Sequence, residues 1–381
     1  MGQARIFQLD VLRGIAIFMV MGVHVPAYPI WSNFGGYGVD LFFVLSGFLI
    51  SNLLFTEYRK HQNIRLGRFL ARRALKLYPS FYLLFAVTLI YAVFWNVPLK
   101  GRQILGEAIL TQNYIGSIWG HTWSLSVEEH FYLLLPVLLL VLMKLNPGAA
   151  DPFRRLPVIF AAVATVCLGL RVLAAQHPDA NFHVVHWEPT HLRADTLFFG
   201  VFLSYLHNFR PEWLQRATRD PWRLPVSLIS VLGFVPAFFL PWTDPIVYTM
   251  GFTCLYIAFG AMLILTLYQE NRKRPEPGRG GRAFAAMGRY SYTIYLWHVP
   301  LAQLFAFLAP RFGMVNQYLL HAVYFATTMA VGVATSKLVE LPALRLRERL
   351  FPAEHAPSRD RGQHDSAQRE QECSRVPVAL S

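Results

Sequence analysis

Long apolar runs alternate with short polar segments along almost the whole chain. Ten of these runs approach the roughly 20 residues that a helix needs to cross a bilayer. They cover approximately residues 8–26, 38–56, 79–97, 130–143, 156–175, 194–207, 224–240, 247–268, 290–309 and 318–339. A soluble core could not bury so many runs of this length. The pattern therefore predicts an all-α integral membrane protein, a bundle of about ten transmembrane helices.

Composition agrees with this fold class. The 381-residue chain is 54% hydrophobic and only 15% charged, whereas soluble domains carry about 25% charged residues. We expect a transmembrane domain over residues 1–350 and a disordered cytoplasmic tail over residues 351–381, which is polar. The first apolar run contains Arg13 and lacks a small-residue cleavage site, so it predicts an uncleaved span. Three distant cysteines predict neither a disulfide framework nor a metal site.

The net charge of +13 could indicate a nucleic-acid partner, but its distribution favours a topology signal. If the N-terminus is cytoplasmic, the inner loops hold most of the basic residues, as the positive-inside rule requires. The loop between the second and third spans holds Arg59, Lys60, Arg65, Arg68, Arg72, Arg73 and Lys76. The outer segments hold only Lys100, Arg102, Arg171, Arg193 and Arg311. We therefore expect both termini to be cytoplasmic and expect no nucleic-acid partner.

Ionisable side chains inside predicted spans are costly and are usually functional. Arg13 and His24 are separated by about 16 Å along a helix and point within about 20° of each other, so both face the bundle interior. His24 lies near the outer end and can accept a proton near neutral pH. An ion pair with Asp10, which would hold the span in register, explains Arg13 equally well.

Other polar groups gather at the ends of later spans. Arg72, Arg73 and Lys76 form a compact basic cluster before Pro79, which suits a phosphate-bearing ligand, although inner-loop charge is the default explanation. Gly38 and Gly47 favour close helix packing. Towards the outer side the sequence places Asp40, Ser124, Ser126, Glu128, Arg193 and Asp195. In the ninth span, Ser291, Tyr295 and His298 share one helix face, where a core histidine is an equally good explanation of His298.

Six motifs occur in the order seen in the membrane acyltransferase-3 family. They are Arg13 with ten residues before His24, GVDLFFVLSGFL, RRALKLYP, WSLSVEEHFY, RADTLFFG and YSYTIYLWH. The chain resembles this family from residue 8 to about residue 343. The resemblance implies a ten-span bundle in the bacterial cytoplasmic (inner) membrane. It also implies O-acylation of carbohydrates and other small acceptors by acyl-CoA, commonly acetyl-CoA.

The resemblance also assigns roles to individual residues. Arg13 and His24 match the family's essential first-span motif, and Glu128 matches the acid of its Trp-Ser-Leu motif. Arg73 and Lys76 match a pair that is usually Arg-x-x-Arg. Because Lys76 lacks the bidentate fork of arginine, this departure weakens phosphate binding at that position, and Arg72 could compensate. Some members carry a fused periplasmic esterase-like domain, and we expect no such activity from the short segment after Pro352.

These assignments lead to a mechanistic hypothesis. Arg72, Arg73 and Lys76 hold the CoA phosphates, Arg13 organises the channel or meets the donor, and His24 acts as general base toward the acceptor hydroxyl. Glu128 or Asp40 orients His24. Candidates for the acceptor side are Ser124, Ser126, Arg193, Asp195 and His298. We expect acyl-CoA as a co-substrate, with no metal and no tightly bound cofactor; the partners are the lipid bilayer and a carbohydrate or related hydroxyl acceptor.

Three alternatives stay open. A transporter or flippase would also place charges inside spans, although the repeated halves that such proteins often show are not apparent. In a structural or sensory membrane protein, the polar residues would serve only to hold helices together. Within the enzyme hypothesis, direct transfer is the simpler route, and an acyl-enzyme on His24 or a serine is the other.

Overall fold

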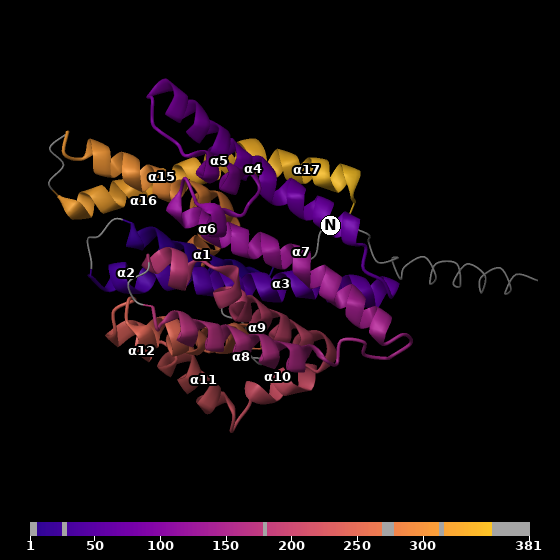
Figure 1. Ribbon diagram of the computed structural model, residues 1–381. Coiled ribbons are helices and arrows are strands. Elements are labelled where there is room, and N and C mark those ends of the chain that lie inside the picture. The colour runs from indigo at the N-terminus through magenta and orange to yellow at the C-terminus, as the bar shows by residue number, and fades with distance from the viewer. Residues whose placement is uncertain (1–5, 25–28, 178–180, 269–277, 312–315, 353–381) are drawn as a thin grey trace, which may run out of the picture.

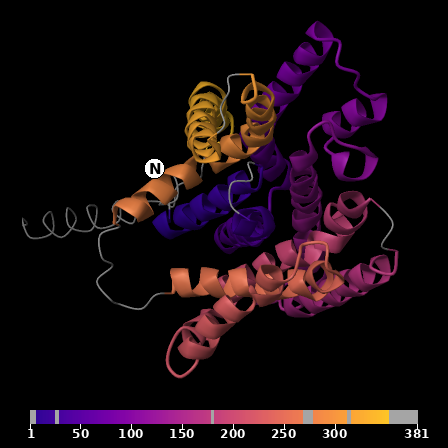
Figure 2. The ribbon, with the colours of Figure 1, turned by 90° about the vertical axis from the view of Figure 1, so that its left-hand side faces the viewer.

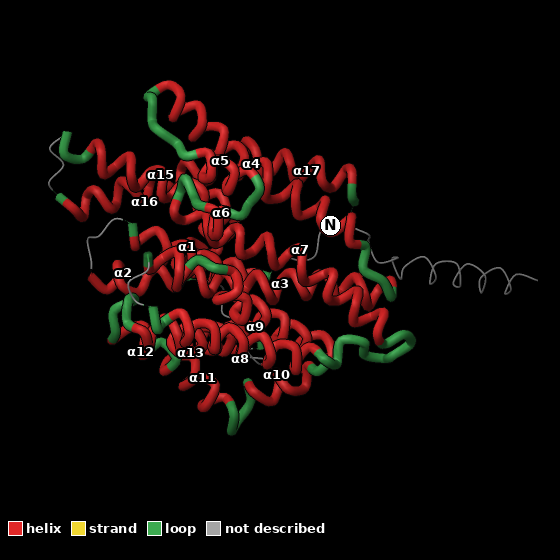
Figure 3. Tube along the Cα trace, viewed as in Figure 1, coloured by secondary structure: helices red, strands yellow, loops and turns green. Residues whose placement is uncertain are grey.

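The computed structural model describes residues 6–24, 29–177, 181–268, 278–311 and 316–352, and all regular structure in these ranges is helical (Figure 3). The longer helices are α1 (Phe7–Val23), α3 (Gly38–His61), α4 (Leu66–Phe94), α7 (Trp123–Leu145), α8 (Leu156–Ala174), α9 (Thr190–Phe209), α13 (Phe252–Leu267), α15 (Ser291–Leu308) and α16 (Gln317–Thr335). The shorter helices are α2 (Pro29–Phe34), α5 (Gly101–Ala108), α6 (Gln112–Ile115), α10 (Pro211–Ala217), α11 (Arg223–Leu232), α12 (Val235–Phe239), α14 (Arg279–Arg289) and α17 (Leu341–Leu350). Single turns of 3-10 or π geometry are η1 (Gly35–Tyr37), η2 (Gly120–Thr122), η3 (His183–Trp187), η4 (Val247–Gly251) and η5 (Ser336–Glu340).

Within the described ranges, six helical segments are long and apolar enough to cross a membrane. They are Gly35–His61, Leu66–Phe94, Gly120–Leu145, Leu156–Ala174, Val247–Leu267 and Gln317–Leu350. This result confirms the predicted all-helical membrane class. The other four predicted spans coincide with α1, α9, α11 together with α12, and α15, which are not among the six. The total of about ten transmembrane helices therefore stays a prediction.

Two helices begin earlier than the apolar pattern predicts. The third predicted span starts at residue 79, but α4 begins at Leu66 and continues through Pro79. A helix in a membrane tolerates an internal proline where neighbouring groups satisfy the freed carbonyl. In the same way, α7 begins at Trp123 rather than at residue 130. As a result, both the basic cluster and the polar segment around Glu128 lie on helices.

The helices α1 and α3 lie in the centre of the bundle (Figure 2). In α3, 72% of the apolar window is buried within the protein, compared with 22% in α4 and 17% in α8. A helix that is apolar all round and mostly buried belongs to the core, whereas an apolar helix with little internal burial faces lipid. We conclude that α3 forms the core and that α4 and α8 have wide surfaces for the bilayer.

Glycines set two close helix contacts. A Cβ atom at Gly47 of α3 would lie 2.0 Å from the carbonyl oxygen of Leu197 in α9. A Cβ atom at Gly14 of α1 would lie 1.9 Å from the carbonyl oxygen of Phe284 in α14. Such backbone proximity requires residues without side chains. The packing interpretation of Gly47 is confirmed, and α14, which the sequence assigns to an inner loop, is a helix packed along α1.

The first and last described helices begin and end on the same side of the bundle, at the right of Figure 1. The cytoplasmic placement of both termini stays a prediction. Of the predicted disordered tail, Phe351 and Pro352 are described, and residues 353–381 lie outside the described ranges. Cys167 and Cys254 are unpaired.

Candidate active site

Three histidine rings from different elements meet at one end of the bundle. His24 directly follows α1, His298 lies within α15, and His121 lies in η2, just before α7. The ring centroid of His298 is 5.0 Å from that of His24 and 4.8 Å from that of His121. His24 is exposed, whereas His121 and His298 are buried. Two of these residues were predicted from the sequence, and the structure brings them together with a third.

Hydrogen bonds to the backbone define the protonation of the two buried rings. The Nδ1–H of His298 donates to the carbonyl oxygen of Tyr295, and the Nε2–H of His121 donates to that of Leu296 at 3.2 Å. A carbonyl oxygen only accepts, so each ring donates from that nitrogen and its other nitrogen carries a lone pair. Within the described ranges, Nε2 of His298 and Nδ1 of His121 have no hydrogen-bond partner. Both rings therefore present free acceptor atoms.

A hydroxyl pair holds His121 against α15. The Tyr295 hydroxyl donates to the carbonyl oxygen of His121 at 2.7 Å and accepts from the Ser124 hydroxyl at 2.6 Å. Ser124 thus lies beside the histidines and anchors the start of α7, and its acceptor-side role stays a prediction. Ser126 is fully buried, and its hydroxyl has no partner among the described residues.

The two predicted orienting carboxylates lie elsewhere. Glu128 accepts hydrogen bonds from Ser46 at 2.6 Å and from Tyr132 at 2.5 Å. Asp40 accepts from Arg193 at 2.6 Å. In the part of the chain that the structure describes, neither carboxylate makes a hydrogen bond to His24. The expected orienting role is not visible in this geometry and stays a prediction.

A second polar centre consists of two ion pairs, Asp40–Arg193 at 2.6 Å and Asp195–Arg171 at 2.7 Å. All four side chains are at most 1% exposed. The Arg193 guanidinium lies 3.8 Å from the ring centroid of Phe252, so an aromatic face covers the charge. Arg193 and Asp195, which the sequence assigns to the acceptor side, are therefore engaged in two separate ion pairs. We call these four residues the paired centre.

Arg13, Arg73 and Lys76 interact in the interior, whereas Arg72 does not belong with them. From here on, the name basic cluster refers to Arg13, Arg73 and Lys76. Lys76 interacts electrostatically with Arg13, Arg73, Glu340 and Arg347. Arg73 lies 4.0 Å above the ring of Tyr132, whose hydroxyl donates to Glu128. In the described ranges, neither Arg73 nor Lys76 forms an ion pair. The expected role of Arg13, to organise the channel or to meet the donor, stays a prediction.

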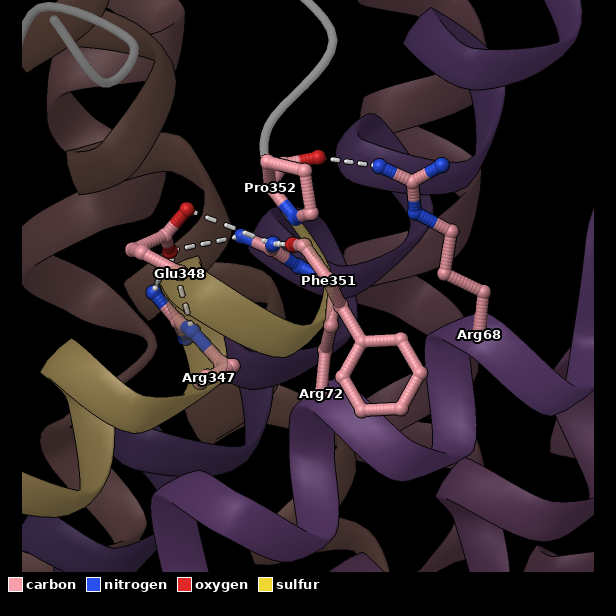
Figure 4. A network of polar contacts seen from close by, with 6 residues as sticks. All are labelled: Arg68, Arg72, Arg347, Glu348, Phe351 and Pro352. Atoms are coloured by element: carbon pink, nitrogen blue, oxygen red, sulfur yellow. Dashed lines mark hydrogen bonds and ion pairs between the residues drawn. The ribbon is translucent and has the colours of Figure 1, made fainter.

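Unlike that of Arg73, the side chain of Arg72 contacts the C-terminal end of α17 (Figure 4). It forms an ion pair with Glu348 of α17 at 2.9 Å and donates to the carbonyl oxygen of Phe351. Arg68 donates to the carbonyl oxygen of Pro352. Because α4 is helical here, Arg72 and Arg73 point in directions about 100° apart. Arg72 holds the end of α17, and the expected compensation for Lys76 is not visible in this geometry.

Three residues near these sites are not among the candidate site residues identified from the sequence. His121 begins the polar segment that contains Glu128, and Arg171 is an ionisable residue inside the predicted span 156–175, so each carries a readable signal. Glu188, between η3 and α9, is 8% exposed, and its burial raises the pKa of its carboxyl group to about 7. It interacts electrostatically with Tyr295, which places a titratable carboxyl group near the histidines. Nothing in the sequence around Glu188 distinguishes it from a loop residue.

A cavity of about 490 Å³ lies away from both centres and contains none of the predicted residues; Arg59, Asp151 and Arg210 are among the residues that line it. Arg210 and Asp151 form an ion pair at 3.2 Å there. Among the described residues, no group of His, Cys, Asp and Glu side chains is arranged to hold a metal ion.

Comparison with known proteins places the chain in a family. Residues 6–337 match the acyltransferase domain family. The chain belongs to this family. The match confirms the predicted family resemblance and the predicted class of enzyme. No solved structure matches the chain.

Several curated relatives have similar sequences. The peptidoglycan O-acetyltransferase OatA of Listeria monocytogenes is 26% identical over 88% of this chain and 55% of its own length. The O-acetyltransferase OatA of Staphylococcus aureus is 28% identical over 77% of this chain and 50% of its own length. The putative peptidoglycan O-acetyltransferase YrhL of Bacillus subtilis is 27% identical over 77% and 48%. The chain thus spans about half the length of these relatives.

Proposed function

We propose that this chain is a membrane O-acyltransferase that transfers an acyl group, and specifically acetyl, from acyl-CoA to a hydroxyl group of an envelope carbohydrate of the peptidoglycan type. The observation that carries the proposal is the meeting of His24, His121 and His298, two of which present buried and unpartnered lone pairs. Neutral imidazoles of this kind can accept the proton that a hydroxyl loses when it attacks a thioester. The names of the relatives support acetyl as the group and peptidoglycan as the acceptor type.

The basic cluster supports an anionic donor. Arg73 carries a positive charge that no ion pair neutralises in the described ranges, and Lys76 interacts electrostatically with both Arg73 and Arg13. Guanidinium and ammonium groups form strong, charge-assisted hydrogen bonds with phosphate oxygens. In our proposal these three residues bind the phosphates of CoA. The acyl end of the donor then extends past Glu128 and Tyr295, which interact electrostatically, toward the histidines.

The exposed position of His24 suits the acceptor side. Its ring stands at the end of α1 beside the buried His298, so a hydroxyl group can reach it without entering the bundle. His24 takes the proton of that hydroxyl, which strengthens the oxygen as a nucleophile. We further propose that the protein lies in the bacterial cytoplasmic membrane, with the basic cluster reached from the cytoplasm. The donor and the acceptor would then meet from opposite faces.

The test uses membranes that contain the full-length protein, supplied with radiolabelled acetyl-CoA and with peptidoglycan or envelope extracts. We expect label in the carbohydrate fraction with the wild type and a loss of label with His24→Ala. His207→Asn is a matched control, because His207 lies in the last turn of α9 and contacts the Tyr268 hydroxyl at 2.5 Å. Transfer by His24→Ala at the wild-type rate would exclude His24 as the base. Absence of transfer by the wild type with a panel of acyl-CoAs would overturn the proposed function.

A further inference from the structure

His298 is the central and most protected member of the three histidines. Its side chain is 0% exposed, and its ring lies between those of His24 and His121. The Tyr324 hydroxyl donates to the carbonyl oxygen of His298 at 3.2 Å, which ties this turn of α15 to α16. The ring is therefore held in place, and its Nε2 lone pair is directed into the protein without a partner among the described residues.

The hydrogen bonds argue against a proton wire through the three rings. A wire requires each imidazole to take a proton on one nitrogen and release one from the other. The Nδ1–H of His298 points at the carbonyl oxygen of Tyr295, which cannot take the proton away. His121 has the same arrangement on Leu296. Each buried ring can therefore act only through its single free nitrogen, as a base or as a nucleophile.

The same bond prepares His298 to carry a positive charge. When Nε2 forms a bond to carbon, the ring becomes an imidazolium whose Nδ1–H still donates to the Tyr295 carbonyl oxygen. Hydrogen bonds from an ionised donor are roughly twice as strong as neutral ones, so the bond strengthens as the charge forms. Burial also keeps water away from a reactive acyl group on this atom.

The two neighbours of His298 are less suited to bond formation. The free nitrogen of His121 is Nδ1, which stands next to the Cβ branch and is the more hindered of the two ring nitrogens. His24 is exposed, so an acyl group on its ring would be open to hydrolysis. His24 and His121 are instead placed on either side of His298 as proton acceptors.

We propose that Nε2 of His298 is a covalent carrier of the acyl group between donor and acceptor. In the first step, the Nε2 lone pair attacks the thioester carbonyl carbon, the C–S bond breaks, and CoA leaves as a thiolate. In the second step, the acceptor oxygen attacks the acyl carbon while His24 takes the hydroxyl proton. The N–C bond breaks, His298 returns to its neutral form, and the proton on His24 is finally taken by the CoA thiolate. This inference rests on the proposed O-acyltransferase function.

An isotope-exchange experiment separates this route from direct transfer. Membranes with the full-length protein receive acetyl-CoA and radiolabelled CoA in the absence of any acceptor. A covalent intermediate lets labelled CoA enter the acetyl-CoA pool, because the first step is reversible without the acceptor, as in ping-pong kinetics. We expect exchange with the wild type, exchange without carbohydrate transfer with His24→Ala, and loss of both reactions with His298→Asn. His207→Asn should exchange and transfer like the wild type.

Rapid denaturation of the wild type near neutral pH, where an acylimidazole survives longer than in acid, provides a second measurement that does not depend on the folding of a variant. Mass spectrometry should locate the acetyl group on the peptide that contains His298. Carbohydrate transfer by the wild type without exchange would overturn the covalent route and leave the proposed function standing. Label on another side chain, or exchange that persists in His298→Asn, would also overturn it. Absence of both transfer and exchange in the wild type would reject the proposed function itself.

Discussion

The paired centre and the basic cluster both place arginines inside the bundle, but they handle the charge in opposite ways. In the paired centre, Arg193 and Arg171 each meet a carboxylate within 2.7 Å and are at most 1% exposed. In the basic cluster, Arg73 and Lys76 are only half-buried and form no ion pair in the described ranges. A charge that is buried and neutralised holds helices together, whereas a charge left available can bind an anion. The difference fits a structural role for the first region, and it fits the proposed role of the second region in binding the anionic donor.

The largest expected effect breaks the paired centre. Asp40→Ala leaves Arg193 buried without its carboxylate, which costs about 3–5 kcal/mol for a buried pair. We expect a large fall in the unfolding temperature of the detergent-purified protein. The double variant Asp40→Leu with Arg193→Met removes both charges and should recover most of the stability, since an apolar replacement of a buried pair is often neutral. Normal stability of Asp40→Ala with complete loss of transfer would move Asp40 to the catalytic site.

The second prediction removes charges from the basic cluster. Here we expect weaker CoA binding without a loss of stability. Arg73→Gln and Lys76→Gln should leave the unfolding temperature unchanged or raise it, because like charges are removed. A hydrogen bond to a charged group contributes about 1.5–3 kcal/mol, so the Kd for CoA should rise roughly tenfold or more for each variant. Equilibrium binding of CoA to each purified variant measures the change. Loss of stability without loss of CoA affinity would give this cluster a structural role.

The third prediction concerns the close contact of α3 with α9 that positions Asp40 and Arg193. Gly47→Ala places a methyl group where the Leu197 carbonyl oxygen is 2.0 Å away, and the backbones must separate. Overpacking of this kind typically costs about 1–3 kcal/mol. Gly169→Ala in α8 is the control, because no atom lies within 4 Å of the added Cβ. Equal unfolding temperatures for the two variants would show that the α3–α9 contact contributes little.

The smallest effect is expected at Arg72, which marks the boundary of the basic cluster. The Arg72 and Glu348 side chains are 21% and 43% exposed, and surface ion pairs contribute only about 0–1 kcal/mol. Arg72→Gln should lower the unfolding temperature slightly, and the difference should shrink at high salt. Its Kd for CoA should stay close to that of the wild type. A Kd change as large as that of Arg73→Gln would return Arg72 to the donor site, as the sequence motif predicts.

Much of this organisation is readable from the order of residues. Apolar runs predict the membrane class, and polar residues within or next to these runs predict His24, Glu128 and His298 as site residues. The start of α4 at Leu66 is not readable, because Pro79 and the basic residues before it look like a loop boundary. His121 is missed although it begins the polar segment that contains Glu128, and Arg171 is missed because it was counted as an outer-loop charge.

The amino-acid sequence by itself determined the helical class, the family and most of the candidate site residues. The physical reason is local: backbone groups in a bilayer must form their hydrogen bonds within each segment, so apolar runs of sufficient length become helices. Tertiary structure alone decided which charges are neutralised and which histidines meet. Arg72 and Arg73 are adjacent, yet one holds α17 and the other lies above Tyr132. Pairing depends on side chains from distant segments, and no local pattern records those contacts.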